Sequence, residues 1–222
     1  MVLYTAKNGV YYNLSDFKKD LSDLGEQGFT NKIYINMTNR CSCSCTFCLR
    51  SLKEFDEHNS LWLREEPTVE EVKAEFMKYD WSHVAEIIFC GFGEPTMRLD
   101  DLVEVAAWLK SVHPDIPIRI NTNGLADLVF EKPTAQLLEG IVDTVSISLN
   151  SSDAQKYLDI TRNQFGLKSY QAMLDYAKDC QKYVPHVVMT VVDIIGEEEV
   201  AACQKVCDDN GLTLRVRPYE AN

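Results

Sequence analysis

Long apolar runs, a basic N-terminal stretch and an excess of positive charge are all missing from this sequence of 222 residues. Without a run of about 20 apolar residues no segment can cross a bilayer, and residues 1–7 lack the basic and apolar regions of a secretory signal. Lysine and arginine together number 22 against 34 aspartates and glutamates, and the net charge of −12 would repel a polyanion. We therefore expect a cytoplasmic protein that neither enters a membrane nor binds extended nucleic acid.

Cysteine, by contrast, is plentiful, with eight residues in the chain. In a cytoplasmic protein this number favours reduced thiols and metal binding over a disulfide framework. Four of them fall within residues 41–48, where the accompanying Ser, Thr and Arg residues make the stretch too polar for a buried core. The alternating apolar run 33–37 predicts a strand that ends just before them. The stretch therefore indicates a metal site at the carboxyl end of a strand.

The spacing of these cysteines distinguishes between metals. Cys41, Cys45 and Cys48 form a C-x3-C-x2-C pattern, of which Cys43 is not a part. Because the sequence has no second C-x2-C pair and no distal pair of histidines, a tetrahedral zinc site is disfavoured. Three thiolates on a four-iron cluster would leave one iron open to a substrate or cofactor. An iron–sulfur cluster is the favoured interpretation, and the role of Cys43 is left open.

Strand-like and helix-like segments alternate along the rest of the chain. The predicted strands are 33–37, 86–90, 118–121, 144–150, 187–192 and 214–218. The predicted helices are 68–79, 100–112, 134–140, 167–183 and 197–210, and the first opens with a capping box of Thr68 and Glu71. This alternation argues for an α/β fold with a parallel sheet and right-handed crossovers. Since 222 residues are too few for a typical eight-unit barrel, we expect six strand units.

The first 31 residues do not share this alternation, so we assign residues 1–31 to a leader and residues 32–222 to the main domain. Residues 2–14 predict a hairpin that turns at Asn8-Gly9, and residues 16–24 predict a short amphipathic helix. The leader could cover the bottom of the main domain or be a solvated appendage. Residues 51–66 form a long polar connection, in which His58, Trp62 and Arg64 are candidate substrate contacts or ordinary surface residues.

The pattern Cys41-x3-Cys45-x-Phe47-Cys48, with an aromatic residue before the last cysteine, resembles the signature of the radical S-adenosylmethionine (radical SAM) enzymes. In that family the three cysteines hold a four-iron four-sulfur (4Fe-4S) cluster, whose open iron chelates S-adenosylmethionine. The resemblance implies a partial (β/α)6 barrel of the TIM-like type whose open top binds both groups. It is strongest to the TatD family-associated members, through residues 39–41, 61–63, 89–95, 119–124 and 215–219. This subfamily implies a functional link to a TatD-type nuclease but supplies no substrate.

The resemblance also implies which residues contact S-adenosylmethionine. Gly91, Gly93 and Glu94 match the family's Gly-Glu-Pro motif, which holds the methionine amino group. The other candidates are Phe47 for the adenine, Asn123, Ser148 and Asn150 for the ribose and carboxylate, and Arg162 and Arg217 for the carboxylate. The alternatives are strand-end capping for the serine and the asparagines, and surface ion pairs for the arginines. Residues 192–199 resemble the family's adenine-side G-x-I-x-G-x-x-E segment, with Val192 in place of the first glycine.

In that family, reduction of the cluster releases methionine and a 5′-deoxyadenosyl radical, which takes a hydrogen atom from the substrate. The implied function is therefore enzymatic, on a small-molecule or peptide substrate, and no catalytic residue is assigned. The alternatives are activation of a glycyl-radical partner protein and a noncatalytic electron-transfer or sensing module. A small acidic reductant such as a flavodoxin or ferredoxin would need a basic docking patch, for which Arg40, Arg50 and Lys53 are candidates. The remaining cysteines are assigned to packing rather than to a second cluster: Cys90, Cys180, Cys203 and Cys207.

Overall fold

The computed structural model describes residues 1–52 and 60–218, and its chain forms two compact units. Of the described residues, the first unit contains 1–40, 49–52 and 60–120, and the second contains 41–48 and 121–218. Three residues that entered the predictions, Lys53, His58 and Tyr219, lie outside the described residues. Over the same described ranges, no helix combines the length and the apolar character needed to span a bilayer. The cysteine stretch 41–48 belongs to the second unit, although the strand before it belongs to the first.

The first unit is built on strands in the order β2-β1-β3-β4-β5. Their bounds are β1 Leu3–Lys7, β2 Val10–Asn13, β3 Lys32–Ile35, β4 Glu86–Phe89 and β5 Ile118–Thr122, of which the last two residues are counted with the second unit. β1 runs antiparallel to both β2 and β3, whereas β3, β4 and β5 are parallel. The predicted hairpin is confirmed, with Asn8 and Gly9 at φ 50° and 74°. Its strand β1 extends the sheet beside β3, which is neither of the two expected placements of the leader.

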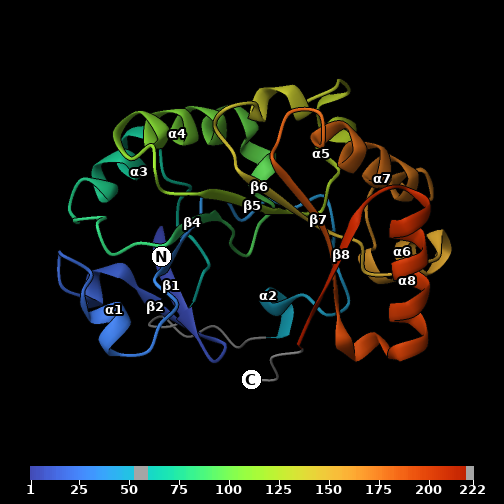
Figure 1. Cartoon of the computed structure of the whole chain (residues 1–222), viewed down its shortest axis with the longest axis horizontal. Coiled ribbons are helices and arrows are strands. Elements are labelled where there is room, and N and C mark those ends of the chain that lie inside the picture. The colour runs from blue at the N-terminus through green and yellow to red at the C-terminus, as the bar shows by residue number, and fades with distance from the viewer. Residues whose placement is uncertain (53–59, 219–222) are drawn as a thin grey trace. The chain divides into compact units, whose positions relative to one another are not determined.

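Two helices of the first unit, α3 (Val69–Phe76) and α4 (Leu99–Val112), lie along one face of the parallel strands (Figure 1). Alternate strand residues beginning at Ile33, Ile87 and Ile118 are at most 4% exposed, as expected for a face covered by helices. The helices bury Val72 and Leu102, among other apolar residues, on their inner side. Four short elements complete the unit: η1 Leu14–Asp16, α1 Asp23–Glu26, α2 Leu49–Leu52 and η2 Pro95–Arg98.

The second unit contains the parallel strands β6 (Thr144–Ser148), β7 (His186–Val192) and β8 (Thr213–Arg217), in that order. Its helices are α5 Ala126–Phe130, η3 Ala135–Leu138, α6 Ala154–Thr161, α7 Lys168–Cys180, η4 Asp193–Ile195 and α8 Glu197–Asp209. α7 packs on β6 and β7, and α8 packs on β7 and β8 (Figure 1). The alternation of strands and helices confirms the predicted α/β class, and each unit contributes three of the six parallel strands.

Several predicted helices differ from those observed. The predicted helix 16–24 is largely replaced by the short elements η1 and α1, and the predicted helix 134–140 is the 3-10 turn η3. Among the described residues three α-helices were missed: α2, α5 and α6. The start of α6 has a local cause, since the Asp153 side chain accepts a hydrogen bond from the Lys156 amide (2.9 Å) and caps the helix. The end of α6 also has a local cause, because Arg162 adopts φ 45° and turns the chain out of the helix.

The packing role predicted for three cysteines of the second unit is confirmed. Cys180, Cys203 and Cys207 have no exposed surface. Burial raises the pKa of Cys180 and Cys203 to about 12 and that of Cys207 to about 11, so these thiols stay protonated and make poor metal ligands. Cys90, in the first unit, is only partly buried.

The capping box predicted at the start of α3 is present and gives the first testable prediction. The Thr68 hydroxyl accepts from the Glu71 amide (3.1 Å), and the Thr68 amide donates to the Glu71 carboxylate (2.8 Å). Thr68→Ala removes the hydroxyl that accepts from the Glu71 amide and weakens the reciprocal hydrogen bond to the Glu71 carboxylate. We therefore expect the free energy of unfolding to fall by about 0.5–2 kcal/mol. Urea denaturation measures this, and an unchanged midpoint would show that the box contributes nothing.

Candidate metal centre

The cysteine stretch, residues 41–48, is a loop whose backbone is held by the end of α6. The carbonyls of Ile160 and Thr161 and the amide of Gln164 supply its partners. Three backbone hydrogen bonds join the two segments: Ser44 N to Thr161 O (2.9 Å), Thr46 N to Ile160 O (2.9 Å) and Gln164 N to Ser42 O (3.1 Å). Because these bonds use main-chain groups, they leave the cysteine side chains available for other contacts.

The four thiols of this loop differ in exposure. Cys41, Cys45 and Cys48, the predicted ligands, are partly exposed, whereas Cys43 is 4% exposed. The Cys43 thiol forms hydrogen bonds with Cys41 and Cys45, and these contacts together with burial raise the pKa of Cys43. Cys43 therefore differs from the other three thiols in its burial, and the assignment of Cys41, Cys45 and Cys48 as ligands stays a prediction.

The donor set fits an iron–sulfur cluster. It consists of three accessible thiols on one anchored polar loop, and thiolates are the ligands that iron–sulfur clusters use. Within the described part of the chain, no three His, Cys, Asp or Glu side chains are gathered as ligands of a single metal ion. Ligands of a four-iron cluster bind different iron atoms, so they need not gather around one ion as the ligands of zinc must.

Asn123 follows β5 and contacts the cysteine loop directly. Its side-chain amide lies within hydrogen-bond distance of the Ser42 hydroxyl (3.1 Å) and the Cys43 sulfur (3.5 Å). Its side-chain oxygen accepts from the Leu125 amide (3.0 Å) and so fixes the turn into α5. The structure therefore shows a capping and loop-holding role for this predicted cofactor contact.

The other predicted contacts of the second unit lie at its strand and helix ends. Ser148 is the last residue of β6, and Arg217 is the last residue of β8. Because β6, β7 and β8 are parallel, both residues lie at the carboxyl ends of the strands. Asn150, two residues after β6, adopts φ 62°, and Arg162 follows the carbonyl of Thr161 that holds the cysteine loop. Phe47 is 42% exposed. The structure thus brings Asn123 and the end of α6 to the cysteines, and leaves Phe47 accessible.

Glu199, the last residue of the segment 192–199, has a role that sequence reasoning missed. One carboxylate oxygen accepts from the Ser151 hydroxyl (2.8 Å), the Ser152 amide (2.8 Å) and the Ser152 hydroxyl (2.9 Å), and the other pairs with Lys156 (3.2 Å). The bond from the Ser152 amide is the largest of the effects that lower the pKa of Glu199 to about 2. Glu199 therefore fixes the turn that follows Asn150.

In the first unit, the Gly-Glu-Pro motif forms a tight turn between β4 and η2. Glu94 is 5% exposed, and its carboxylate accepts from the amide (3.1 Å) and hydroxyl (2.9 Å) of Thr96, which caps η2. Its own amide donates to the carbonyl of Arg40 (2.8 Å), which immediately precedes Cys41. The motif is therefore attached to the chain that leads into the cysteine loop.

The two glycines of the motif are required by close backbone approach. A Cβ atom on Gly91 would stand 2.0 Å from the Asn36 side-chain oxygen. One on Gly93 would stand 2.2 Å from the carbonyl oxygen of Thr38 and 2.8 Å from that of Arg40. No side chain fits at either position, so the turn packs directly on residues 36–40.

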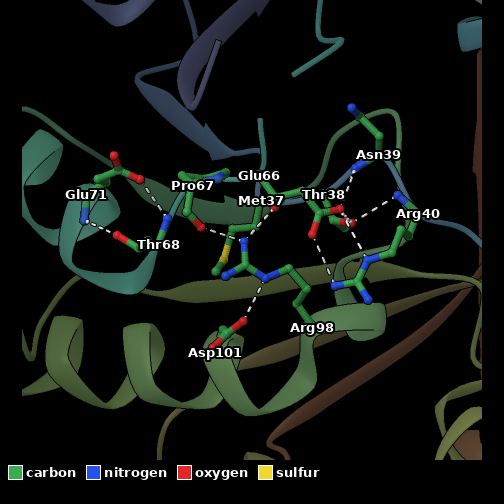
Figure 2. A network of polar contacts seen from close by, with 10 residues as sticks. All are labelled: Met37, Thr38, Asn39, Arg40, Glu66, Pro67, Thr68, Glu71, Arg98 and Asp101. Atoms are coloured by element: carbon green, nitrogen blue, oxygen red, sulfur yellow. Dashed lines mark hydrogen bonds and ion pairs between the residues drawn. The ribbon is translucent and has the colours of Figure 1, made fainter. Parts of the chain in front are cut away.

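Residues 37–40, here called the pre-cysteine segment, are held from their other side by a polar network (Figure 2). Glu66 accepts from the Thr38 hydroxyl, from the Asn39 amide (3.3 Å) and from Arg40 Nε (3.2 Å), and also pairs with Arg40 Nη2 (3.1 Å). Arg98 donates to the carbonyls of Met37 (2.9 Å) and Pro67 (2.6 Å) and pairs with Asp101 (2.7 Å). Sequence reasoning identified neither Glu66 nor Arg98.

The residues predicted to contact a substrate or a reductant are mostly engaged within the protein. Trp62 is 36% exposed and packs edge-on against Phe92, with ring centroids 5.7 Å apart. Arg40 is paired with Glu66, and Arg50 donates to the carbonyl of Asn39 (3.4 Å). The pairing of Arg40 offsets part of the positive charge expected for a docking patch.

The close approach at Gly93 yields a second prediction. Gly93→Ala places a methyl group against two backbone oxygens, so the pre-cysteine segment must move, and we expect the stability loss to reach about 1–3 kcal/mol. Gly25→Ala is the matched control, because its new Cβ would lie 3.8 Å from the Asn31 side chain, an ordinary contact. Urea unfolding of the two variants tests this, and equal stabilities would contradict it.

The low pKa of Glu199 gives a third prediction. A carboxylate whose pKa falls from 4.5 to about 2 on folding adds stability that is complete above its unfolded pKa and is lost as the pH falls toward 2. Glu199→Gln should therefore lower the free energy of unfolding by about 1–3 kcal/mol at pH 7, and by less at about pH 3.5. Glu198→Gln, at an exposed neighbour, should change it by under about 0.5 kcal/mol. A Glu199→Gln effect that is the same at both pH values would refute this.

Two curated relatives show what this chain is similar to. A GTP 3',8-cyclase of Corynebacterium glutamicum (strain R) is 28% identical over 191 residues, which are 82% of this chain and 47% of the cyclase. A putative glycyl-radical enzyme activating enzyme, MJ1227 of Methanocaldococcus jannaschii, is 27% identical over 175 residues, which are 76% of this chain and 66% of that protein. The chain spans about half the length of the cyclases that it matches.

A solved structure and a family model complete the comparison. Methylornithine synthase (PylB) matches the fold with a TM-score of 0.57 at 15% identity, over 84% of this chain and 52% of that one, and this likeness confirms the α/β fold of the open-barrel type. The sequence model of the Radical SAM superfamily matches residues 35–205, which include the three accessible cysteines and the Gly-Glu-Pro turn. Members of this superfamily use a 4Fe-4S cluster and S-adenosylmethionine. The chain belongs to the radical SAM superfamily.

Proposed function

We propose that this chain is a radical SAM enzyme that holds a 4Fe-4S cluster on Cys41, Cys45 and Cys48 and acts on a substrate that is still to be identified. The observation that carries the proposal is the set of three accessible thiols on a loop anchored through its backbone, in a chain of this superfamily. When bound, the reduced cluster supplies one electron that breaks the C5′–S bond of S-adenosylmethionine, giving methionine and a 5′-deoxyadenosyl radical that takes a hydrogen atom from the substrate.

The protein's own part is to bind, orient and shield these groups. We propose that the backbone carbonyls of Gly91 and Gly93 accept from the methionine ammonium group, beside the buried carboxylate of Glu94. In the second unit, Asn123, Ser148 and Asn150 offer hydroxyl and amide groups for the ribose and carboxylate, and Phe47 offers a ring for the adenine. Arg162 and Arg217 are the candidates for a bidentate contact with the carboxylate.

A small acidic reductant, such as a flavodoxin or ferredoxin, is the proposed electron donor. The described docking candidates are Arg40, which also pairs with Glu66, and Arg50, which also donates to the Asn39 carbonyl. We further propose a cytoplasmic location and a functional link to a TatD-type nuclease, which rest on the sequence features alone.

The two relatives favour different substrates. The cyclase is named for a nucleotide, and by similarity a small-molecule substrate of that class is the first candidate. MJ1227 is named as an activator of glycyl-radical enzymes, which favours a partner protein as the second candidate. A noncatalytic electron-transfer or sensing module is the remaining alternative, and cleavage of S-adenosylmethionine separates it from both.

The test is reconstitution of the cluster without oxygen, followed by dithionite and S-adenosylmethionine and measurement of 5′-deoxyadenosine. We expect product from the wild type and none from Cys45→Ala, which lacks one proposed ligand. Cys203→Ala is the matched control, because it removes a buried thiol that is 0% exposed, and it should retain the product.

Two outcomes would contradict the proposal. A wild type that assembles no cluster would remove its basis. Equal product from the wild type and Cys45→Ala would show that the cleavage does not depend on the proposed ligands.

A further inference from the structure

The pre-cysteine segment, residues 37–40, ends one residue before Cys41 and has no regular secondary structure. It follows β3, which ends at Ile35, so no strand pairing fixes its course. Its position is instead set by side chains from elsewhere in the first unit and by the turn at Gly93-Glu94. Because Arg40 is bonded to Cys41, the contacts that fix the position of residues 37–40 also fix the position at which the cysteine loop begins.

Residues 60–67, in the connection between α2 and α3, supply most of these contacts. Figure 2 shows the part made by Glu66. Asn39 pairs with Leu63 in both directions, its amide donating to the Leu63 carbonyl (2.7 Å) and its oxygen accepting from the Leu63 amide (3.0 Å). Just before the segment, the Asn36 amide donates to the carbonyl of Leu61 (2.5 Å). Residues 60–67 thus run alongside residues 36–40 as a polar support.

Glu66 is the centre of this support. Its contacts to Thr38, Asn39 and Arg40 all fall on the three residues before the first cysteine. The Thr38 hydroxyl also accepts from the Arg40 amide (2.9 Å), so Glu66 and the Arg40 backbone are linked through one hydroxyl. Thr38 is 2% exposed, which distinguishes this arrangement from an ordinary surface ion pair.

The other side of the same backbone carries the Gly-Glu-Pro turn. The Arg40 carbonyl accepts from the Glu94 amide, and Gly93 packs on the carbonyls of Thr38 and Arg40. If loss of Glu66 displaced residues 37–40, the start of the cysteine loop would move. The Arg40 carbonyl, which accepts from the Glu94 amide, would move with it.

We propose that Glu66 is a positioning residue for the cluster. By holding Thr38, Asn39 and Arg40, Glu66 fixes the backbone that precedes Cys41, the proposed ligand. It also fixes the Arg40 carbonyl, which accepts from the Glu94 amide of the Gly-Glu-Pro turn. This inference rests on the proposed use of Cys41 as a cluster ligand. Groups that orient ligands from outside the coordination sphere typically change metal retention when they are removed.

The test compares the reconstituted full chain with Glu66→Ala and two controls. Thr68→Ala lies two residues away and destabilises α3 without touching the pre-cysteine segment. Glu104→Gln removes a surface ion pair with Lys73 (2.6 Å). The measurements are the rate of iron release to a chelator and the electron paramagnetic resonance spectrum of the reduced cluster, with and without S-adenosylmethionine.

We expect Glu66→Ala to release iron about 10-fold faster than the wild type and to show a broadened spectrum with a smaller response to S-adenosylmethionine. Thr68→Ala and Glu104→Gln should keep the wild-type rate and spectrum. Glu66→Gln should fall between, because it keeps an oxygen for Thr38 and Asn39 but loses the ion pair with Arg40.

The inference would be overturned if Glu66→Ala matched Thr68→Ala in its rate of iron release and its spectrum. A merely structural role of Glu66 would change the stability of the protein and leave both measurements unchanged. If Glu66→Ala does not fold, Thr38→Val removes the hydroxyl that links Glu66 to Arg40, and a wild-type release rate from that variant would overturn it equally. A wild type that holds no cluster would instead refute the proposed function, so the two failures are distinguishable.

Discussion

The hydrogen bond from the Glu94 amide to the Arg40 carbonyl is the contact on which the first unit's part of the site depends. It joins the chain leaving β3 to the chain leaving β4, two parallel neighbours in the sheet. It can form only because Gly93 lacks a side chain and lets the two backbones meet. Within the first unit, the Gly-Glu-Pro motif is thereby joined to Arg40, the residue before Cys41.

The cysteine loop receives its own support from the second unit. Backbone bonds from the end of α6 and the side chain of Asn123 hold it, while Glu199 fixes the turn after Asn150. These supports use main-chain groups, amides and carboxylates, and they add to the contact of the Cys43 amide with the Cys41 sulfur (3.4 Å) inside the loop. A loop held in this way presents its thiols before iron arrives, which limits the conformational entropy that cluster binding must overcome.

Features encoded by neighbouring residues could be predicted from the sequence. The spacing of Cys41, Cys45 and Cys48, the capping box at Thr68 and the hairpin at Asn8-Gly9 each depend on residues a few positions apart. The alternating strands and helices gave the α/β class for the same reason. The predicted contacts with S-adenosylmethionine came from resemblance and stay predictions, and for Asn123 the structure shows a contact with the cysteine loop.

The supporting residues could not be predicted, because their partners are distant in sequence. Glu66 lies 26 to 28 residues from the segment it holds, and Glu199 lies 47 to 48 residues from its serines. Glu66 does not differ from an ordinary surface glutamate in its local pattern, and the segment 192–199 pointed to adenine contacts and not to the serines that Glu199 holds. The helices α5 and α6 were missed because they are short, with five and eight residues, and their apolar periodicity is correspondingly weak.

The proposed site is a four-iron cluster held by three cysteines, with one iron open to S-adenosylmethionine. A Mössbauer spectrum of protein reconstituted with 57Fe, recorded before and after S-adenosylmethionine is added, tests this site directly. We expect about four irons per chain, of which one alone changes its isomer shift when S-adenosylmethionine is added. A spectrum in which every iron keeps the same parameters, or in which the iron is not part of a cluster, would contradict it.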